Sequence, residues 1–403
     1  MFNCRSCHSQ NTQSIIPLGE QPLANGLHAS SKIDQEPRYN LEVMLCQDCG
    51  LAQLRDLIDP SELFTDYVYF SSNSDTMLRS AADLVDRIRP TLSEDSLVVE
   101  IASNDGYLLK NYISQGIQVL GVDPAQNIAK FANENGIPTL CDFFNDELAL
   151  KLVNEGKKAD IIHANNVMAH VPDINSFVKG IKILLKEKGQ AIIEVPYFAD
   201  LVEKLEFDTI YHEHVYYFSV KPLRTVFGRY GLEIFDIEKI AIHGGTLRMF
   251  VGHKGAYPVQ PVVEEMLDKE EKSNLYAVGN FKNFVQRIDD LGAELRKVLG
   301  NLKKQGAKIA AYGASAKGTT LLNYFKIDKQ YLDFVVDRSL AKQGHYTPGT
   351  HLLIKSPSAL IEDGANYALL LTWNFAEEIL AQQARYRSEG GKFIIPLPVV
   401  RIV

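Results

Sequence analysis

The chain has 403 residues, of which 46% are hydrophobic, and a formal net charge of −8. This length supports two or three domains with large buried cores, and the acidic balance argues against a nucleic-acid-binding surface, which needs a net basic footprint. The sequence has neither an apolar run of about 18 residues nor a signal peptide's charged-then-apolar start. We therefore expect a cytoplasmic protein without a membrane-bound segment.

Two Cys-x-x-Cys pairs open the chain, Cys4 with Cys7 and Cys46 with Cys49, and a fifth cysteine, Cys141, stands apart. Each short turn aims two sulfurs at one point, so two such pairs can close the tetrahedral four-thiolate site of a structural zinc ion. Their spacer is longer than the usual ribbon spacing of about 15–20 residues. We predict structural zinc, with redox-active dithiols as the alternative, and no disulfide framework.

The segment that follows is expected to link the zinc module to the core of the next domain. A helix is predicted after Ser74 and ends near Arg89, because Pro90 cannot continue it. The aromatic residues just before the helix, at 67–70, would either pack in the core or cover a ligand site.

The centre of the chain is organised around two apolar, β-branched runs, residues 97–101 and 119–122. The first run ends in an Asn-Asp-Gly turn at 104–106, where the free N–H groups of a helix N-terminus favour an anionic group. The second ends at Asp123, which is placed to accept ribose hydroxyls. The pattern predicts a nucleoside site, with a plain α/β turn as the alternative.

The glycine content of this turn narrows the choice of nucleoside. A dinucleotide fingerprint needs G-x-G-x-x-G, whereas the turn from Glu100 to Gly106 reads Glu-Ile-Ala-Ser-Asn-Asp-Gly. It suits a ligand without phosphates. The form resembles motif I of the class I S-adenosylmethionine (SAM)-dependent methyltransferases, in which acidic and amide side chains hold the methionine amino and carboxylate groups. Ala102 stands where that superfamily usually has glycine, and it should crowd the turn.

Helical and strand patterns alternate downstream of the turn. We predict helices over residues 124–135 and 146–154 and up to 186, and strands over 137–141, 160–164 and 190–195. Such alternation predicts a doubly wound parallel sheet. Ser219 is expected to cap a helix that stops at Gly231. Two further strands, near 233–240 and 246–252, resemble the closing hairpin of the class I methyltransferase sheet and complete a set of seven.

The last third of the chain predicts a second α/β unit. Residues 262–305 are expected to form one helical spacer, and a strand at 308–312 leads into the loop Gly-Ala-Ser-Ala-Lys-Gly at 313–318. A P-loop needs lysine directly after the second glycine, where this chain has Thr319, and a dinucleotide loop needs a middle glycine, where it has Ser315.

The strand that follows this loop ends at Asp337, which favours a degenerate Rossmann-like domain. A contact between the loop and a nucleotide or nucleotide sugar is one interpretation. A structural relic is the other.

The residues that suggest chemistry lie at 209–218, which contain Tyr-His-Glu-His at 211–214. So many polar rings suit a cleft better than a core, because every ring nitrogen and hydroxyl would need a buried partner. Histidine beside a carboxylate is an arrangement for a general base, and His170 could face the same space. His212 and His214 are two residues apart, which does not suit zincin-type ligation on a helix.

These motifs together resemble the three-part sugar C-methyltransferases of deoxysugar biosynthesis, which act on nucleotide-linked keto-deoxysugars. The resemblance spans nearly the whole chain. In chain order, the motifs are the two Cys-x-x-Cys pairs, Tyr-Val-Tyr-Phe-Ser-Ser at 67–72, Glu-Ile-Ala-Ser-Asn-Asp-Gly at 100–106, Asn-Val-Met-Ala-His-Val-Pro-Asp at 166–173, Tyr-His-Glu-His at 211–214, His-Gly-Gly-Thr-Leu-Arg at 243–248, Tyr-Gly-Ala-Ser-Ala-Lys-Gly at 312–318 and Lys-Gln-Gly-His-Tyr-Thr-Pro-Gly at 342–349.

The resemblance implies an α/β chain with three parts. These are a zinc-binding module over residues 1–75, a seven-stranded, Rossmann-like class I methyltransferase domain over 76–258, and a degenerate Rossmann-like domain with its spacer helix over 259–403. We expect a monomer or a weak homo-oligomer that binds a nucleotide-linked ketosugar.

The resemblance also assigns roles to individual residues. The SAM site would comprise Ala102, Asn104, Asp105, Gly106, Asp123, Pro124, Phe143, Asn165 and Asn166. The catalytic residues would be His214, Glu213, Tyr211 and His170. The sugar nucleotide would contact Tyr67, Phe70, His243, Arg248 and Lys317, with Arg248 pairing with the diphosphate.

We hypothesise that His214 removes a proton beside a 4-keto group, that Glu213 orients this histidine, and that Tyr211 or His170 donates to the enolate oxygen. The enolate carbon would then take the methyl group of SAM. Two other functions remain open from sequence: an O- or N-methyltransferase for a small acceptor, and an NAD-type oxidoreductase or binding protein that uses the C-terminal unit.

Overall fold

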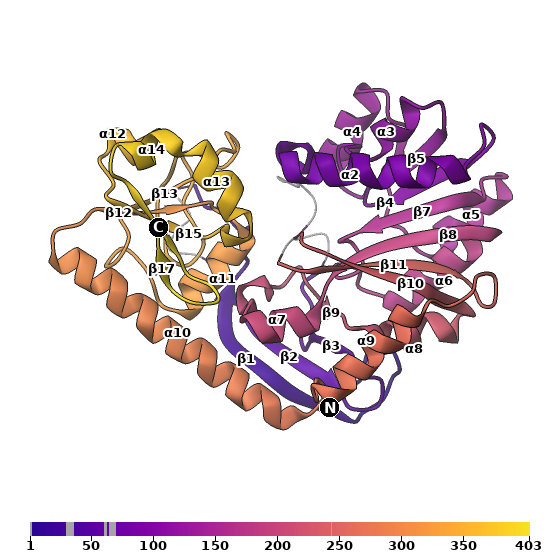
Figure 1. The fold of residues 1–403 in the computed structure, drawn as a ribbon, viewed down its shortest axis with the longest axis horizontal. Coiled ribbons are helices and arrows are strands. Elements are labelled where there is room, and N and C mark those ends of the chain that lie inside the picture. The colour runs from indigo at the N-terminus through magenta and orange to yellow at the C-terminus, as the bar shows by residue number, and fades with distance from the viewer. Residues whose placement is uncertain (1, 30–35, 60–62, 64–69, 243) are drawn as a thin grey trace.

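The computed structural model describes residues 2–29, 36–59, 63, 70–242 and 244–403, which form three sheets with their helices (Figure 1). In Figure 1 the seven-stranded sheet lies on the right, the C-terminal sheet on the left, and strands β1 and β2 below them. The predicted three-part α/β architecture is confirmed: an N-terminal four-stranded sheet, a central seven-stranded sheet and a C-terminal six-stranded sheet.

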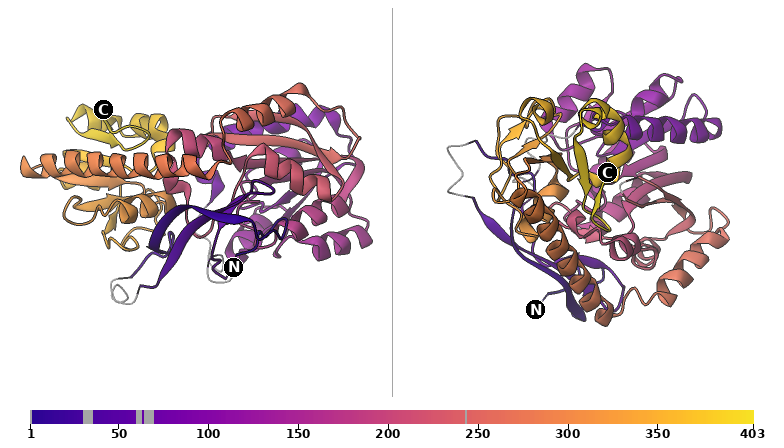
Figure 2. Two further views of the ribbon diagram at one scale, coloured as in Figure 1. Left: turned by 90° about the horizontal axis from the view of Figure 1, so that it is seen from below. Right: turned by 60° about the vertical axis from the view of Figure 1, so that its left-hand side comes forward.

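The N-terminal sheet is antiparallel and has the order β1-β2-β3-β9. Its strands are β1 (Thr12–Pro22), β2 (Arg38–Cys46), β3 (Ala52–Leu54) and β9 (Tyr216–Tyr217). Strand β9 comes from the middle of the chain and directly follows the Tyr-His-Glu-His motif, so this motif is fixed against the N-terminal sheet. Figure 2 shows β1 and β2 from below, and β1 also contacts the C-terminal helices.

The central sheet has seven strands in the order β10-β11-β8-β7-β4-β5-β6. Strands β4 to β8 are parallel, and β10 and β11 form the antiparallel hairpin that was predicted. The strands are β4 (Leu97–Ile101), β5 (Gln118–Val122), β6 (Thr139–Leu140), β7 (Ala159–Asn165), β8 (Leu185–Pro196), β10 (Leu232–Ile240) and β11 (Thr246–His253).

Helices cover both faces of this sheet, as a doubly wound sheet requires. One buried cluster joins α2, α3 and α4 to one face, and another joins α5, α6 and α8 to the other. The helices are α2 (Asp75–Ile88), α3 (Leu109–Ile113), α4 (Gln126–Glu134), α5 (Asp146–Asn154), α6 (Ile174–Leu184), α7 (Phe198–Lys204) and α8 (Val220–Arg229).

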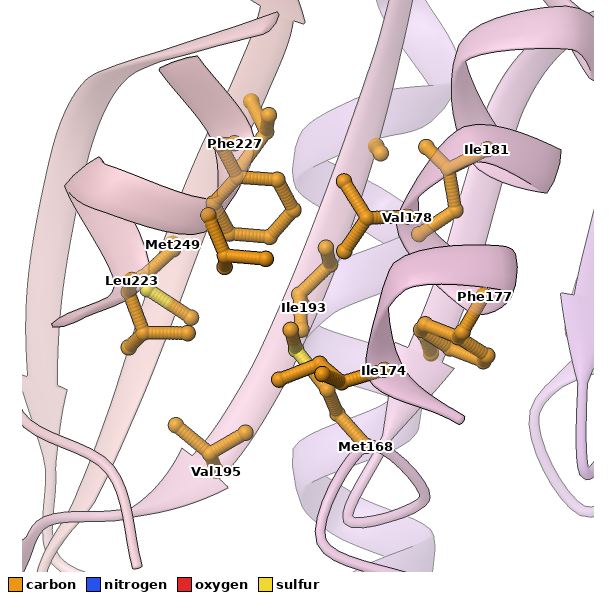
Figure 3. Close-up of a cluster of buried hydrophobic side chains, with 14 of the residues drawn as sticks. Met168, Ile174, Phe177, Val178, Ile181, Ile193, Val195, Leu223, Phe227 and Met249 are labelled. Carbon is orange, nitrogen blue, oxygen red and sulfur yellow. The ribbon is translucent and has the colours of Figure 1, made fainter. Parts of the chain in front are cut away.

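The core beneath α6 and α8 is a dense layer of aliphatic, methionine and phenylalanine side chains (Figure 3). Ile174 and Val178 of α6 lie beside Ile193 of β8, and Phe227 of α8 lies near Met249 of β11. Each such side chain contributes roughly 1.5–3 kcal/mol by burial. This layer packs α6 and α8 against the sheet, whose strands end at the large cavity described below.

The N-terminus of α8 differs from the prediction. Ser219 does occupy the cap position, but its side chain caps no helical N–H group and instead lies 2.8 Å from the Tyr276 hydroxyl. The buried carboxylate of Glu270 accepts the Val220 and Lys221 N–H groups at 2.6 and 3.1 Å. A carboxylate from a neighbouring helix thus replaces the expected serine cap.

The expected single spacer helix is two helices, α9 (Pro261–Lys272) and α10 (Val278–Lys304). The prediction of one continuous helix was wrong because the chain turns at residues 273–277, where Asn274 adopts a left-handed conformation with φ of 52°. One face of α10 is buried against both β1 and the C-terminal domain, through a shared cluster that includes Ile16, Phe284 and Leu295.

The C-terminal sheet has six strands in the order β14-β13-β12-β15-β16-β17, all parallel except the last pair. Its strands are β12 (Ile309–Tyr312), β13 (Phe334–Val336), β14 (Ile354–Lys355), β15 (Tyr367–Leu370), β16 (Lys392–Ile395) and β17 (Arg401–Ile402). Its helices are α11 (Ala316–Tyr324), α12 (Ala359–Glu362), α13 (Ala376–Gln382) and α14 (Ala384–Ser388). Within the described ranges, none of the helices is long and apolar enough to cross a membrane.

Candidate active site and metal centre

One large cavity, of about 1480 Å³, is walled by all three parts of the chain. The N-terminal segment contributes Leu23, Asn25 and Gly26. The methyltransferase sheet contributes residues that follow the carboxyl ends of β4, β5 and β7, where ligands bind in doubly wound folds. The third wall consists of the turn after β12, the start of α11 and the loop after β13.

The turn after β4 holds three residues with left-handed backbone conformations. Ala102 and Asn104 have φ of 54° and 50°, in the left-handed region that favours glycine. Gly106 has φ of 77°, and a Cβ atom there would lie 2.1 Å from Ile137 Cδ1, so only glycine fits. Ala102, which was expected to crowd the turn, adopts the left-handed conformation that glycine would adopt without strain.

Asp123 fastens this turn to the end of β5. Its carboxylate accepts the Asn104 N–H at 2.9 Å and the Ala125 N–H at 3.0 Å. Burial raises the pKa of Asp123, and the two backbone donors lower it. Asp123 and Asn104 both line the cavity, whereas Asp105 and Gly106, also predicted for the SAM site, are not among its lining residues.

Residues 70–72 cover the turn from the cavity side. The Ser71 N–H donates to Asn104 Oδ1 at 2.9 Å, and the Ser72 N–H donates to Asp105 Oδ2 at 3.1 Å. Phe70 lines the cavity and packs edge-on against Phe131 with ring centroids 5.4 Å apart, and its contact with the sugar nucleotide stays a prediction.

Several buried acceptors at this end have no hydrogen-bond partner among the described residues. They are Asp105 Oδ1, Asn165 Oδ1, Asn166 Oδ1 and both oxygens of Glu100. Buried acceptors without partners cost free energy unless a ligand or water pairs with them. Pro124, the half-exposed ring of Phe143, Asn165 and Asn166 line the cavity here. Of these acceptors, those of Asn165 and Asn166 belong to residues that line the cavity, on the same wall as Asp123 and the ring of Phe143. These groups could hold the polar and aromatic parts of SAM.

His214 is held in one tautomer by its neighbours. Its Nδ1 lies 2.8 Å from the Thr209 carbonyl oxygen, which can only accept, so Nδ1 carries the hydrogen. In the neutral ring Nε2 is then an acceptor, and it lies 2.7 Å from the Tyr211 hydroxyl, which donates to it. Both residues line the cavity. The result is a tyrosine–histidine pair with a basic nitrogen on the cavity side.

Glu213 is not the orienting partner of His214, so this prediction was wrong. Both ring nitrogens of His214 are engaged as described, and Glu213 Oε1 instead accepts a hydrogen bond from Asn25 Nδ2 at 2.6 Å. The side chains of the neighbouring residues Glu213 and His214 point in different directions, and that of Glu213 points toward Asn25 of the N-terminal segment. Burial raises the pKa of Glu213 to about 7, against the lowering effect of Asn25.

His170 completes this wall of the cavity. Its ring packs edge-on against the His214 ring, with centroids 4.8 Å apart. Burial lowers the pKa of His170 to about 4, so its ring is neutral near pH 7. The structure therefore brings together the four predicted catalytic residues, His170, Tyr211, Glu213 and His214, in one cavity.

The C-terminal wall repeats the arrangement in which Asp123 accepts two backbone N–H groups. Asp337, just after β13, accepts the Ala314 N–H and the Ser339 N–H, each at 2.8 Å. Lys317 lines the cavity, lies 4.5 Å from the Trp373 ring centroid and donates to Asn374 Oδ1. Burial lowers the pKa of Lys317, and Asp208 and Glu206 raise it.

Arg248 does not line the cavity, so its predicted contact with a diphosphate was wrong. It lies on β11, where its Nε donates to Glu194 Oε1 at 2.7 Å, and its side chain is only 8% exposed. This pairing partner on the adjacent strand β8 is invisible in a linear sequence. Tyr67 and His243, two further predicted substrate residues, lie outside the described residues.

Sequence reasoning missed Asn25 and the cationic residues of the loop after β13. Asn25 stands before Gly26 in a pattern that predicts only a turn. Arg338 and Lys342 line the cavity. Arg338 and Lys342 follow Asp337, the aspartate that ends the predicted strand, and this position could have marked them as ligand-binding candidates.

The four predicted cysteines form one cluster whose donor atoms all lie within 4.8 Å of one another. Sγ of Cys4 lies 3.7 Å from that of Cys49, and Sγ of Cys7 lies 3.5 Å from that of Cys46. Tetrahedral zinc with Zn–S bonds of about 2.3 Å spaces its sulfurs about 3.8 Å apart. Gln53 also donates to Cys4 Sγ at 3.2 Å, as residues behind a metal site do. The cluster fits zinc.

Three family models match the chain in order. They describe a putative zinc binding domain at residues 4–64, a methyltransferase domain at 74–237 and a C-methyltransferase C-terminal domain at 241–398. A structure of magnesium protoporphyrin IX methyltransferase (ChlM) from Synechocystis PCC 6803 with bound SAM is 14% identical, covers 44% of this chain and 79% of its own, and has a TM-score of 0.34.

Two curated relatives differ in how much of the chain they match. A ubiquinone biosynthesis O-methyltransferase from Bartonella quintana is 30% identical over 97 residues, or 24% of this chain and 39% of its own length. The C-methyltransferase NovU from Streptomyces niveus is 33% identical over 404 residues, which cover 99% of this chain and 96% of NovU. The full-length match to NovU and the three family models thus identify the chain as a SAM-dependent methyltransferase with a zinc-binding domain, and it belongs to the family of C-methyltransferases that includes NovU.

Proposed function

We propose that this enzyme transfers a methyl group from SAM to a carbon beside the keto group of a nucleotide-linked 4-keto-deoxysugar. One observation carries the proposal: the Asp123 turn and the Asp337 turn face the same cavity, whose walls also contain His214. Two strand-ending carboxylates suit two nucleosides, one for each half. At about 1480 Å³ the cavity exceeds the usual size of a small-ligand pocket, about 300–1,000 Å³, as two ligands require.

The nucleotide of the sugar would bind the C-terminal wall. Asp337 would accept ribose hydroxyls, while Lys317, Arg338 and Lys342 line the same wall and offer positive charge to a diphosphate. Lys342 is held in place by a hydrogen bond from its Nζ to the Ala314 carbonyl oxygen at 2.8 Å. These residues replace Arg248 as the diphosphate partners.

His214 would act as the general base. A C–H bond beside a ketone is acidified by that ketone, so a positioned base can remove the proton if the enolate oxygen is stabilised. The Nδ1 hydrogen of His214 is committed to Thr209, which leaves the Nε2 lone pair to take the proton. The C–H electron pair then forms the enolate carbon–carbon double bond.

Tyr211 would donate to the enolate oxygen. Its hydroxyl bonds His214 Nε2 at 2.7 Å in the absence of substrate, and rotation of this hydroxyl toward the keto oxygen would free Nε2 at the same moment. The neutral ring of His170, with its pKa lowered to about 4, is a poor base and suits a second donor. Bound SAM supplies an electrophilic sulfonium methyl group, and the enolate carbon needs to lie within about 3–3.5 Å of it.

Mass analysis of products from a panel of nucleotide-linked 4-ketosugars, with isotope-labelled SAM, tests this proposal. We expect the mass of one methyl group on one or more members and a new carbon–carbon bond to that methyl by NMR. A methyl on oxygen or nitrogen would favour the small-acceptor O- or N-methyltransferase. No methylation together with a nicotinamide fluorescence change on titration with NADH would favour the oxidoreductase. From composition we further propose a cytoplasmic enzyme that works as a monomer or weak homo-oligomer.

A further inference from the structure

A second group of metal-ligating side chains lies outside the cavity. It consists of His28, Glu36 and His351, whose donor atoms all lie within 4.8 Å of one another. His28 Nε2 lies 2.8 Å from Glu36 Oε1, and His351 Nε2 lies 3.2 Å from Glu36 Oε2. His28 and Glu36 belong to the N-terminal module, and His351 belongs to the C-terminal domain.

We propose that His28, Glu36 and His351 form a second divalent-metal site, of the zinc type, that ties the N-terminal module to the C-terminal domain. Two imidazoles and one carboxylate are a common zinc ligand set, with water in the fourth position. Tetrahedral zinc with bonds of about 2.0–2.2 Å places nitrogen and oxygen donors about 3.3–3.5 Å apart. The observed contacts of 2.8 and 3.2 Å are shorter, so each imidazole would move away from Glu36, by about half an ångström for His28 and less for His351, when an ion binds between them.

The backbone around the cluster is fixed before any metal binds. His28 and Tyr346 exchange two backbone hydrogen bonds, of 3.1 and 2.9 Å, which join the two domains at this point. Gly349 donates its N–H to both oxygens of Glu36 at 2.8 and 2.9 Å. A Cβ atom at Gly349 would lie 1.8 Å from Asn323 Oδ1, so this glycine allows the loop to sit directly on α11.

The three side chains are exposed enough for a water molecule to reach the metal as its fourth ligand. The side chains of His28, Glu36 and His351 are 14%, 7% and 23% exposed, so the carboxylate is enclosed and one imidazole reaches the surface. None of the three residues lines the active-site cavity. The site would therefore be structural in its effect.

The metal would act on the active site through the segment that it anchors. Leu23, Asn25 and Gly26 line the cavity just before His28, and Asn25 holds Glu213. The Thr319 hydroxyl of α11 also donates to the Ala24 carbonyl oxygen at 2.9 Å. The segment from Leu23 to His28 is thus held near its start by Thr319, and a metal ion at His28 would hold its other end.

Metal analysis of the full-length protein tests the site. Protein is saturated with Zn²⁺, freed of unbound metal and measured by mass spectrometry, and Co²⁺ loading distinguishes thiolate from nitrogen–oxygen ligation by its spectrum. We expect two metal ions per chain in wild type, one for each cluster, and one in Glu36→Gln and His351→Asn. His345→Asn changes a histidine of the same loop and should keep both ions.

Thermal unfolding gives an independent reading. The starting sample is protein whose four-cysteine cluster already holds zinc. Further Zn²⁺ should raise the unfolding temperature of wild type and of His345→Asn, but not that of Glu36→Gln or His351→Asn. A wild type that holds only the thiolate-bound ion under Zn²⁺ excess would overturn the proposal. In that case the cluster is a hydrogen-bonded clasp, in which both imidazoles donate to Glu36. Using two variants guards against one that fails to fold.

Discussion

Asp123 and Asp337 occupy equivalent positions in two different sheets that face one cavity. Each follows a parallel strand, accepts an N–H group from the turn after the neighbouring strand and accepts a second from the residue two positions further on. The first set of donors is Asn104 and Ala125, and the second is Ala314 and Ser339. The enzyme therefore has, on both sides of its cavity, a strand-ending carboxylate that accepts two backbone N–H groups.

The equivalent positions predict that each aspartate binds one ligand, Asp123 the SAM and Asp337 the nucleotide-linked sugar. Asp123→Asn should weaken S-adenosylhomocysteine binding about 10- to 100-fold, since a charge-assisted hydrogen bond is worth roughly 1.5–3 kcal/mol. Asparagine retains one oxygen for the turn. Asp337→Asn should leave that affinity within about two-fold and weaken binding of the nucleotide-linked sugar instead.

Calorimetry with both ligands and both variants checks the assignment. Unchanged S-adenosylhomocysteine affinity in Asp123→Asn would show that the SAM site is misplaced. Equal losses of both ligands in both variants would indicate that the aspartates act only through the fold.

Glu213 should make the protein less stable as the pH rises. Its carboxyl has a pKa of about 7 in the folded state and about 4.3 unfolded. Because the folded state holds the proton more tightly, the stabilisation is present below about pH 4 and lost as pH rises through 7. This loss of stability amounts to at most about 4 kcal/mol, and Glu213→Gln, which keeps an acceptor for Asn25, should abolish it.

Denaturation midpoints of wild type and Glu213→Gln at pH 5 and pH 8 measure this effect. The variant should gain on wild type at pH 8 relative to pH 5. Glu206 and Asp208, with pKa values raised to about 7 and about 6 by burial, should leave a remaining pH dependence in the variant. An identical pH profile for both proteins would contradict the pKa assigned to Glu213.

Cys46→Ala should lose the thiolate-bound zinc and destabilise the N-terminal sheet, because Cys46 is completely buried and ends β2. Cys141→Ala is the matched control, since Cys141 is exposed and lies outside the cluster. Elemental analysis and thermal unfolding separate the two variants. Wild-type zinc content in Cys46→Ala would refute the four-cysteine site.

Arg248→Met should reduce stability rather than substrate binding. Removing the arginine leaves Glu194, whose side chain is 3% exposed, without its principal cation, and breaking a buried pair in this way costs about 3–5 kcal/mol. The double variant Arg248→Met with Glu194→Leu should recover much of that loss. A raised KM for the sugar nucleotide with unchanged stability would return Arg248 to the substrate site.

The elements that could be predicted from sequence are those specified by local periodicity and spacing. The seven strands, the Asn-Asp-Gly turn and the cysteine cluster follow from short patterns, and the Tyr-His-Glu-His motif was placed correctly in a cleft. Contacts between distant segments could not be predicted. Asn25 reaches Glu213, Glu270 caps α8, and Glu194 pairs with Arg248 only because the tertiary fold joins elements that sequence spacing leaves unrelated.

The central claim is that His214 forms an enolate before methyl transfer, and hydrogen exchange measures that step alone. In deuterated water, with S-adenosylhomocysteine in place of SAM, wild type should exchange one carbon-bound hydrogen beside the keto group, visible by NMR. His214→Asn should lose both exchange and methylation by about 10²–10⁴-fold, the contribution of a positioned base. Methylation by His214→Asn at a rate near that of wild type would contradict the account and remove His214 from the mechanism.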